Sequence, residues 1–348
     1  MGEALVQDVI ATVESLMGSR PLARLPAAGP AQALGRGMNP VHQGWFARNT
    51  SSTQDWPLAR LLSLKESTTI AVVIPARDEQ QTVGQVVGEI ANDLSGLVDE
   101  LLVLDSLSSD RTASVARAAG ATVWSVEDIR PDLGVRAGKG EALWKSQFVT
   151  SSEIVVFIDA DLTGWGTHFV SALLGPLLSD PDSLLVKGFY DRILDMGDGI
   201  SSEGGRVTEL VARPWLALNR PSLSCVVQPL AGEWATRRSH LASLSIPYGY
   251  GVELATLLDT ESRHGVNAIA QVDLGHRAHS HQNLHDLGAM ATEILAVADR
   301  RRRLQQPDEI VLPRLGRDRT WTERRVVTAE RPPFETLEAG PRVEKARR

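Results

Sequence analysis

The fold class of this chain is set by residues 155–161, which read Val-Val-Phe-Ile-Asp-Ala-Asp. Four consecutive apolar residues predict a strand that is buried on both faces of a parallel sheet. Two carboxylates follow at the carboxyl end of the strand, where open α/β sheets bind ligands. Because alternate side chains of an extended chain point the same way, Asp159 and Asp161 are expected to converge. Such hard oxygen donors suit Mg²⁺ or Mn²⁺ carrying a diphosphate. A solvated acidic turn is the alternative for an isolated pair of this kind.

The segments on both sides of this stretch alternate between apolar runs and helical periodicity. Strands are predicted at 70–74 (ending before Pro75), 101–104, 122–124, 184–186 and 269–274. Helices are predicted at 83–94, 110–120, from about 140, and at 207–218, 233–244, 252–263 and 284–303. The charged tail after Pro307 is expected to be irregular. A helix at 5–17 and a Pro/Gly/Ala-rich segment lead into a core that we expect to begin near Ile70. Strands alternating with helices predict a mostly parallel sheet with both faces covered.

Composition and charge exclude several classes of protein. The 348 residues carry a net charge of −7, which argues against a general nucleic-acid or membrane-surface binder. No apolar run approaches the roughly 18 residues of a membrane span, and the first residues do not resemble a secretory signal. The single cysteine, Cys225, lies in an apolar stretch, so we expect a buried structural thiol, no intrachain disulfide and a reducing, cytoplasmic location.

Three further junctions carry polar residues next to predicted strands or helices. Asp78 and Glu79 follow the first strand, where they bind a nucleobase or ribose, or cap the next helix. The loop that begins Asp105-Ser106 suits a ribose, a uracil or a sugar. Gly138-Lys139-Gly140 brings a flexible cation close to a phosphate. It is not a Walker A loop, and no G-x-G-x-x-G follows the first strand, so neither ATP hydrolysis nor dinucleotide binding is indicated.

Two later features suit anions and metals. Gly205 and Arg206, with Thr208, enter a predicted helix and suit an anion, although Arg206 is equally explained as a solvated helix residue. Four histidines lie at 276, 279, 281 and 285 without a zinc-type spacing. One of them is expected to complete a Mg²⁺ or Mn²⁺ shell.

Taken together, residues 70–290 resemble the actinobacterial glucosyl-3-phosphoglycerate synthases, which are retaining glycosyltransferases with the GT-A fold. The segments that carry the resemblance are VIPARDE (73–79), VLDSLSSDRT (103–112), GKGEALWKS (138–146), VVFIDADL (155–162), GGRVTELVARP (204–214), QPLAGE (228–233), GYGVE (249–253) and AIAQVDLGHRAH (268–279). The resemblance implies an α/β fold, with a Rossmann-like mixed sheet that is flanked by helices and binds a nucleotide-sugar. A mostly helical C-terminal acceptor region follows it. The implied divisions are an N-terminal arm (1–45), the nucleotide-sugar-binding core (46–190), the acceptor-binding region (191–305) and a tail (306–348).

The resemblance also implies a reaction and its residues. Glucose would move from UDP-glucose to 3-phospho-D-glycerate in a cytoplasmic homodimer that binds no nucleic acid or membrane. The residues implied to bind UDP-glucose are Pro75, Ala76, Arg77, Asp78, Glu79, Ser106, Lys139, Asp159, Ala160, Leu230, Tyr250 and Glu253. Asp159, Asp161 and His279 would hold Mg²⁺ or Mn²⁺, and Gly205, Arg206, Thr208 and His281 would bind the acceptor. The predicted catalytic residues are Glu253, Asp161 and Lys139.

One departure from the family pattern affects the acceptor. The family motif R-A-H-R-N reads Arg277-Ala278-His279-Ser280-His281 here, so His281 replaces an asparagine that would face the acceptor. Separately from the acceptor, three alternatives stay open: a GDP-sugar donor as in mannosyl-3-phosphoglycerate synthases, a nucleotidylyltransferase, and a nucleotide-sugar sensor without turnover. The second lacks the glycine-rich, arginine-bearing loop after the first strand. The presence of Asp159, Asp161, Arg206, Glu253 and His279 together argues against the third.

Overall fold

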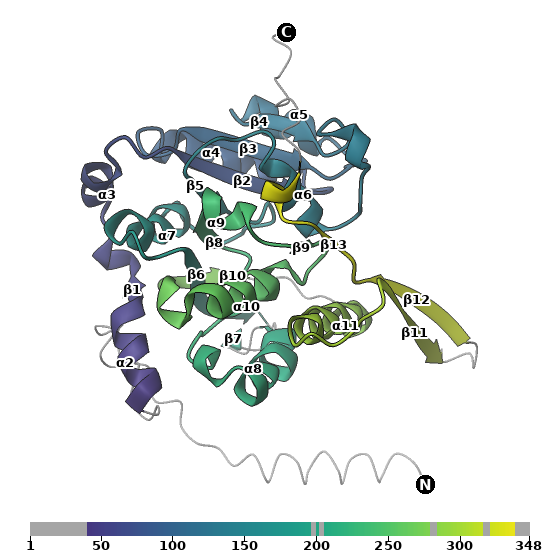
Figure 1. The fold of residues 1–348 in the computed structure, drawn as a ribbon. Helices are drawn as coiled ribbons and strands as arrows, with labels where there is room; N and C mark the ends of the chain where they lie inside the picture. The colour runs from purple at the N-terminus through teal and green to yellow at the C-terminus, as the bar shows by residue number, and fades with distance from the viewer. Residues whose placement is uncertain (1–39, 196–199, 202–204, 279–283, 316–320, 338–348) are drawn as a thin grey trace, which may run out of the picture.

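The computed structural model describes residues 40–195, 200–201, 205–278, 284–315 and 321–337. The predicted helix at 5–17 and the side chains of His279 and His281 lie outside these ranges. A mixed sheet dominates the fold, with the strand order β1-β10-β6-β8-β5-β2-β3-β4, and β7 pairs with β6 (Figure 1). Its strands are β1 (Thr50–Ser52), β2 (Ile70–Ala76), β3 (Glu100–Asp105), β4 (Thr122–Ser125), β5 (Ile154–Phe157), β6 (Leu185–Asp195), β7 (Ile200–Ser201), β8 (Trp234–Arg237) and β10 (Ile269–Ala278).

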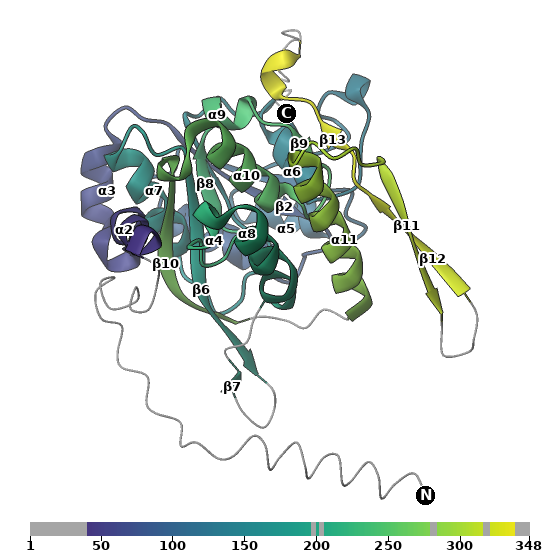
Figure 2. The same cartoon turned by 60° about the horizontal axis from the view of Figure 1, so that its bottom comes forward.

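Helices cover both faces of this sheet (Figures 1 and 2). They are α2 (Pro40–Asn49), α3 (Leu58–Lys65), α4 (Val83–Asp93), α5 (Thr112–Ala118), α6 (Lys139–Ser146), α7 (His168–Ser179), α8 (Arg213–Asn219), α9 (Arg238–Ala242), α10 (Val252–His264) and α11 (Leu284–Arg301). Alternate residues of the central strands enter the two apolar layers: Val72 packs with α4 and α7, whereas Val73 packs with α6 and α10. The predicted α/β class with a mixed sheet is confirmed. None of the described helices is long and apolar enough to span a membrane.

The segment predicted as a helix at 233–244 is instead a strand followed by one short helix. β8 runs antiparallel to both β5 and β6 in the middle of the sheet, and α9 follows it. Trp234 and Ala235 point into opposite apolar layers, which is the period of a strand. The sequence did not predict this strand, because its four residues are too few to show a period. It forms by pairing with residues distant in the chain, Ile154–Phe157 and Leu185–Lys187.

The tail expected to be irregular contains ordered strands. β11 (Glu309–Leu315) and β12 (Trp321–Val327) form an antiparallel hairpin that extends away from the body in Figures 1 and 2. β13 (Glu330–Arg331) pairs with β9 (Ile246–Pro247). Most described side chains of the hairpin are exposed, so the sequence lacks the apolar alternation that marks a half-buried strand.

Two element boundaries also differ from expectation. The core begins before Ile70, because Trp45 and Phe46 on α2 are 3% and 5% exposed and β1 pairs with β10. β2 continues through Pro75 to Ala76. Its pairing with β5 ends at Val73, so the missing N–H of Pro75 costs no ladder bond to that neighbour.

Candidate active site

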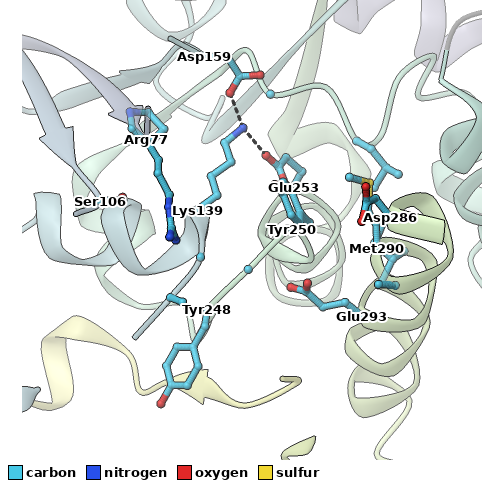
Figure 3. Close-up of a pocket in the computed structure, with 18 of the residues that line it drawn as sticks. Arg77, Ser106, Lys139, Asp159, Tyr248, Tyr250, Glu253, Asp286, Met290 and Glu293 are labelled. Carbon is cyan, nitrogen blue, oxygen red and sulfur yellow. Dashed lines mark hydrogen bonds and ion pairs between the residues drawn. The ribbon is translucent and has the colours of Figure 1, made fainter. Parts of the chain in front are cut away.

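A cavity of about 980 Å³ opens where β2, β3 and β5 end at their carboxyl termini (Figure 3). This is the position at which open α/β sheets bind their ligands. The predicted site residues that line it are Pro75, Ala76, Arg77, Glu79, Ser106, Lys139, Asp159, Ala160, Asp161, Gly205, Arg206, Thr208, Leu230, Tyr250 and Glu253. Residues from seven separate stretches of chain therefore meet in one place.

Asp78 is the described site residue that the structure does not bring to the cavity lining. It adopts a left-handed conformation with φ of 56°. Its carboxylate accepts hydrogen bonds from the N–H and the hydroxyl of Ser109, at 2.7 and 3.0 Å. Asp78 thus links the loop after β2 to the loop after β3. Its neighbours Arg77 and Glu79 line the cavity instead.

Lys139, at the first turn of α6, lies between two carboxylates. Its Nζ is 2.6 Å from Oδ1 of Asp159 and 2.8 Å from Oε1 of Glu253, as Figure 3 shows. Burial disfavours a charged amine here, but the two carboxylates outweigh that cost and raise the pKa of Lys139. The lysine is therefore a fixed cation at the end of β5.

A second cation, Arg277 on β10, was not singled out from the sequence. Its Nη2 lies 3.0 Å from Oδ1 of Asp161, and its Nη1 donates to the buried carboxylate of Glu233 and, at 3.0 Å, to the hydroxyl of Tyr190. Desolvation opposes its charge, yet the pKa of Arg277 is raised by Glu233 first among its partners. Because β10 also carries Gln271, Asp273 and His276, the sequence did not mark Arg277 as its buried charge. Only the structure identifies its partners.

Glycine is required where two walls of the cavity approach each other. A Cβ on Gly232 would lie 2.2 Å from Oδ2 of Asp159 and 2.8 Å from Nζ of Lys139. A Cβ on Gly249 would lie 2.4 Å from Oε1 of Glu293, a buried carboxylate on α11. Sequence reasoning missed both Gly232 and Glu293, because their roles depend on contacts between distant segments.

The two carboxylates of the D-x-D pair fit a divalent cation. Both line the cavity, and burial followed by the charge of Asp159 raises the pKa of Asp161. Lys139 and Arg277 balance part of the charge of the pair, at 2.6 Å from Asp159 and 3.0 Å from Asp161. Carboxylate oxygens are the ligands that Mg²⁺ and Mn²⁺ prefer. No group of three His, Cys, Asp or Glu side chains suited to a metal occurs among the residues that the model describes. The third predicted ligand, His279, lies outside them.

Comparison with known families assigns the class. A family model described as Glycosyl transferase family 2 matches residues 71–207, which include all of β2 except Ile70, the strands β3 to β6 and the D-x-D pair. This match covers the part of the sheet that carries the cavity, and together with the relatives described next it shows that the chain is a glycosyltransferase.

Relatives and solved structures show to which family of glycosyltransferases the chain belongs. A glucosyl-3-phosphoglycerate synthase from Mycobacterium tuberculosis is 51% identical over 245 residues, 69% of this chain and 76% of the relative. One from Petrotoga mobilis is 38% identical over 289 residues, 79% of this chain and 89% of the relative. The solved structure of the M. tuberculosis enzyme with Mn²⁺, UDP-glucose and phosphoglyceric acid matches with a TM-score of 0.76 at 44% identity, covering 83% of this chain and 99% of that one. The chain belongs to the glucosyl-3-phosphoglycerate synthase family.

Proposed function

We propose that this protein transfers glucose from UDP-glucose to 3-phospho-D-glycerate, releasing UDP and forming glucosyl-3-phosphoglycerate. The observation that carries the proposal is the convergence of the D-x-D carboxylates, Lys139, Glu253 and Arg206 on one cavity. Support comes from the related enzyme of M. tuberculosis, whose structure holds Mn²⁺, UDP-glucose and phosphoglyceric acid together.

The donor occupies the half of the cavity next to β2, β3 and β5. Pro75, Ala76, Arg77, Glu79 and Ser106, which follow β2 and β3, border the uridine. Asp159 and Asp161, with His279 from outside the described residues, would hold Mg²⁺ or Mn²⁺ beside the diphosphate. When bound, the cation neutralises the charge that grows on the diphosphate as the sugar–phosphate bond breaks. Lys139 adds a second, fixed positive charge beside the same group.

Glu253 orients the glucose rather than attacking it. Glu253 is 4% exposed, and its carboxylate is ion-paired to Nζ of Lys139 at 2.8 Å. A carboxylate engaged in this way is a weak nucleophile, but it accepts hydrogen bonds from sugar hydroxyls and stabilises positive charge at the anomeric carbon. We therefore propose attack from the front face, with retention of configuration. The acceptor hydroxyl forms the new bond, and its proton passes to the departing phosphate oxygen of UDP.

The acceptor lies beside the turn that enters a π-helical segment, Thr208–Ala212. Gly205, Arg206 and Thr208 line the cavity there. The guanidinium and the N–H groups at the start of a helix suit the phosphate and carboxylate of 3-phospho-D-glycerate. His281, which lies outside the described residues, is also proposed to bind the acceptor.

UDP release in the presence of Mn²⁺ tests this function. We expect release from UDP-glucose to depend on 3-phospho-D-glycerate, with glycerate and other small phosphorylated acids as comparison acceptors. Faster turnover of GDP-mannose would contradict the donor assignment. If the protein binds UDP but releases none from UDP-glucose with any acceptor, it is a nucleotide-sugar sensor and not a transferase. A glucosyl ester on Glu253, trapped during turnover and seen by mass spectrometry, would refute front-face attack.

We also propose that the protein is a cytoplasmic homodimer. The hairpin β11–β12 pairs with no other strand of the described chain and exposes Val311 and Val327, at 43% and 46%. β12 is tied to α11, because Nη1 of Arg324 lies 2.6 Å from Oδ1 of Asp286 and Val326 is buried, and the exposed Val311 is available for contact with a second copy. Cys225 is buried, in keeping with a reducing compartment. Light scattering of the purified chain measures the oligomeric state, and a monomer at micromolar concentration would exclude the dimer.

A further inference from the structure

The C-terminal strap, defined here as residues 328–337, lies beside α6 (Figure 1, yellow). It includes β13, which pairs with β9 directly before the cavity residue Tyr248. Trp144 on α6 donates its Nε1–H to the carbonyl of Pro332 at 3.0 Å. The ring of Phe334 packs against that of Phe148, with 4.8 Å between the ring centroids. The strap is thus bound to the helix that carries Lys139, although no predicted site residue lies in it.

Arg331 is the centre of this contact. Its Nε and Nη2 bind the two carboxylate oxygens of Glu141 at 2.8 and 2.7 Å, a bidentate pair in which Arg331 is 7% exposed and Glu141 0%. The same guanidinium donates to the carbonyls of Leu133 and Gly134 at 2.9 and 3.2 Å. The hydrogen bonds and charge of Glu141 raise the pKa of Arg331. One side chain therefore joins the strap, the first turn of α6 and the loop before it.

The groups joined in this way form a wall of the cavity. Residues 135–139 of the loop and α6 line it, as do Tyr248, Gly249 and Tyr250, whereas Arg331 and Glu141 do not. The N–H of Glu141 donates to the carbonyl of Tyr248 at 3.0 Å. A Cβ on Gly140 would lie 1.9 Å from the carbonyl oxygen of Pro247, so α6 and the strand β9 are in direct backbone contact. A shift of the first turn of α6 would move Lys139 relative to Asp159 and Glu253.

We propose that Arg331 is a positioning residue for the donor: through Glu141 it fixes the first turn of α6, and with it Nζ of Lys139, against the diphosphate of the nucleotide-sugar. This inference rests on the proposed function for the identity of the donor. The bidentate fork is essential, because an ammonium pairs with Glu141 but does not hold both carboxylate oxygens and the Leu133 and Gly134 carbonyls together. The strap outside the matched family region is therefore part of the catalytic apparatus.

Steady-state kinetics of Arg331→Gln and Arg331→Lys test the proposal. Since misplacement of a binding group by about 1 Å costs up to about a hundredfold in rate, we expect Arg331→Gln to lower kcat/KM for UDP-glucose by at least about tenfold. The KM for the acceptor should stay within about twofold, because Arg206 lies on another element. Arg331→Lys should be intermediate. Glu141→Gln should reproduce the defect, and the double variant should be no worse than either single one.

The matched control is Arg237→Gln at the end of β8. Arg237 also anchors backbone, donating to the carbonyls of Leu177 and Ser183 at 2.7 and 3.0 Å, but it does not line the cavity. Arg237→Gln should lower the melting temperature and leave the KM for UDP-glucose unchanged. Arg331 variants that lose thermal stability but keep the wild-type donor KM, as this control does, would overturn the inference. If Arg331→Gln does not fold, wild-type kinetics of Arg331→Lys would overturn it as well.

A failure of the proposed glucosyl transfer can be distinguished from a failure of the positioning role of Arg331. If the wild type releases no UDP, calorimetric binding of UDP replaces the kinetic measurement. Arg331→Gln should then raise the Kd for UDP by about tenfold, while Arg237→Gln should not. An unchanged Kd overturns the positioning role, and a wild type that does not bind UDP overturns both proposals.

Discussion

Glu293 on α11 is the buried acid whose removal should change the pH dependence of folding. Its side chain is 8% exposed and accepts a hydrogen bond from the N–H of Gly251 at 3.0 Å. Burial, followed among the raising effects by the nearby charge of Glu253, raises its pKa from 4.5 to about 7. Replacement by glutamine keeps the shape and an acceptor oxygen for Gly251, but it removes the titration.

The sign and size of the effect follow from proton linkage. In the unfolded chain Glu293 loses its proton near pH 4.5, whereas the folded chain keeps it to about pH 7. Between these values the unfolded state binds fewer protons, so the free energy of unfolding falls as the pH rises. Each pH unit of this interval is worth about 1.4 kcal/mol. The wild type should therefore lose about 3 kcal/mol relative to Glu293→Gln, and the loss should be complete above pH 7.

Urea unfolding of both proteins from pH 4.5 to 8 measures this difference. Subtracting the glutamine variant removes the contributions of all groups that titrate alike in both proteins. A difference between wild type and Glu293→Gln that is the same at pH 5 and pH 8 would refute the argument that burial holds the proton on Glu293.

Three substitutions probe the cavity itself. Asp161→Ala should abolish Mn²⁺-dependent turnover while the far-UV circular dichroism stays native, and near-normal turnover would remove the metal from the mechanism. Arg206→Ala should mainly raise the KM for 3-phospho-D-glycerate; an unchanged value would place the phosphate elsewhere. Gly232→Ala puts a methyl group 2.2 Å from Oδ2 of Asp159. It should therefore force that carboxylate away from Lys139 and lower kcat, and wild-type kinetics would show that the wall yields without cost.

Several features were predictable because they depend on near neighbours in the chain. The buried strand at 154–157, its exit into Asp159 and Asp161, and the helix that begins at Lys139 follow from apolar runs and from glycine and carboxylate positions. The predicted residues that follow β2, β3 and β5 meet at one cavity because parallel strands end on the same edge. The family resemblance, not this rule, brought in Gly205, Arg206, Thr208, Leu230, Tyr250 and Glu253. Asp78 was the exception, because its left-handed turn directs its carboxylate to Ser109.

The sequence by itself determined the α/β class, the strands that carry the D-x-D pair and the resemblance that points to the family, because these depend on local pattern and on motifs. Tertiary structure alone decided which charges meet. β8 enters the sheet through partners far away in the chain, Arg277 pairs with Asp161 and Glu233, and Arg331 reaches Glu141 across 190 residues. A buried charge is stable only beside its partner, and that partner is set by the packing of distant segments rather than by neighbours in the chain.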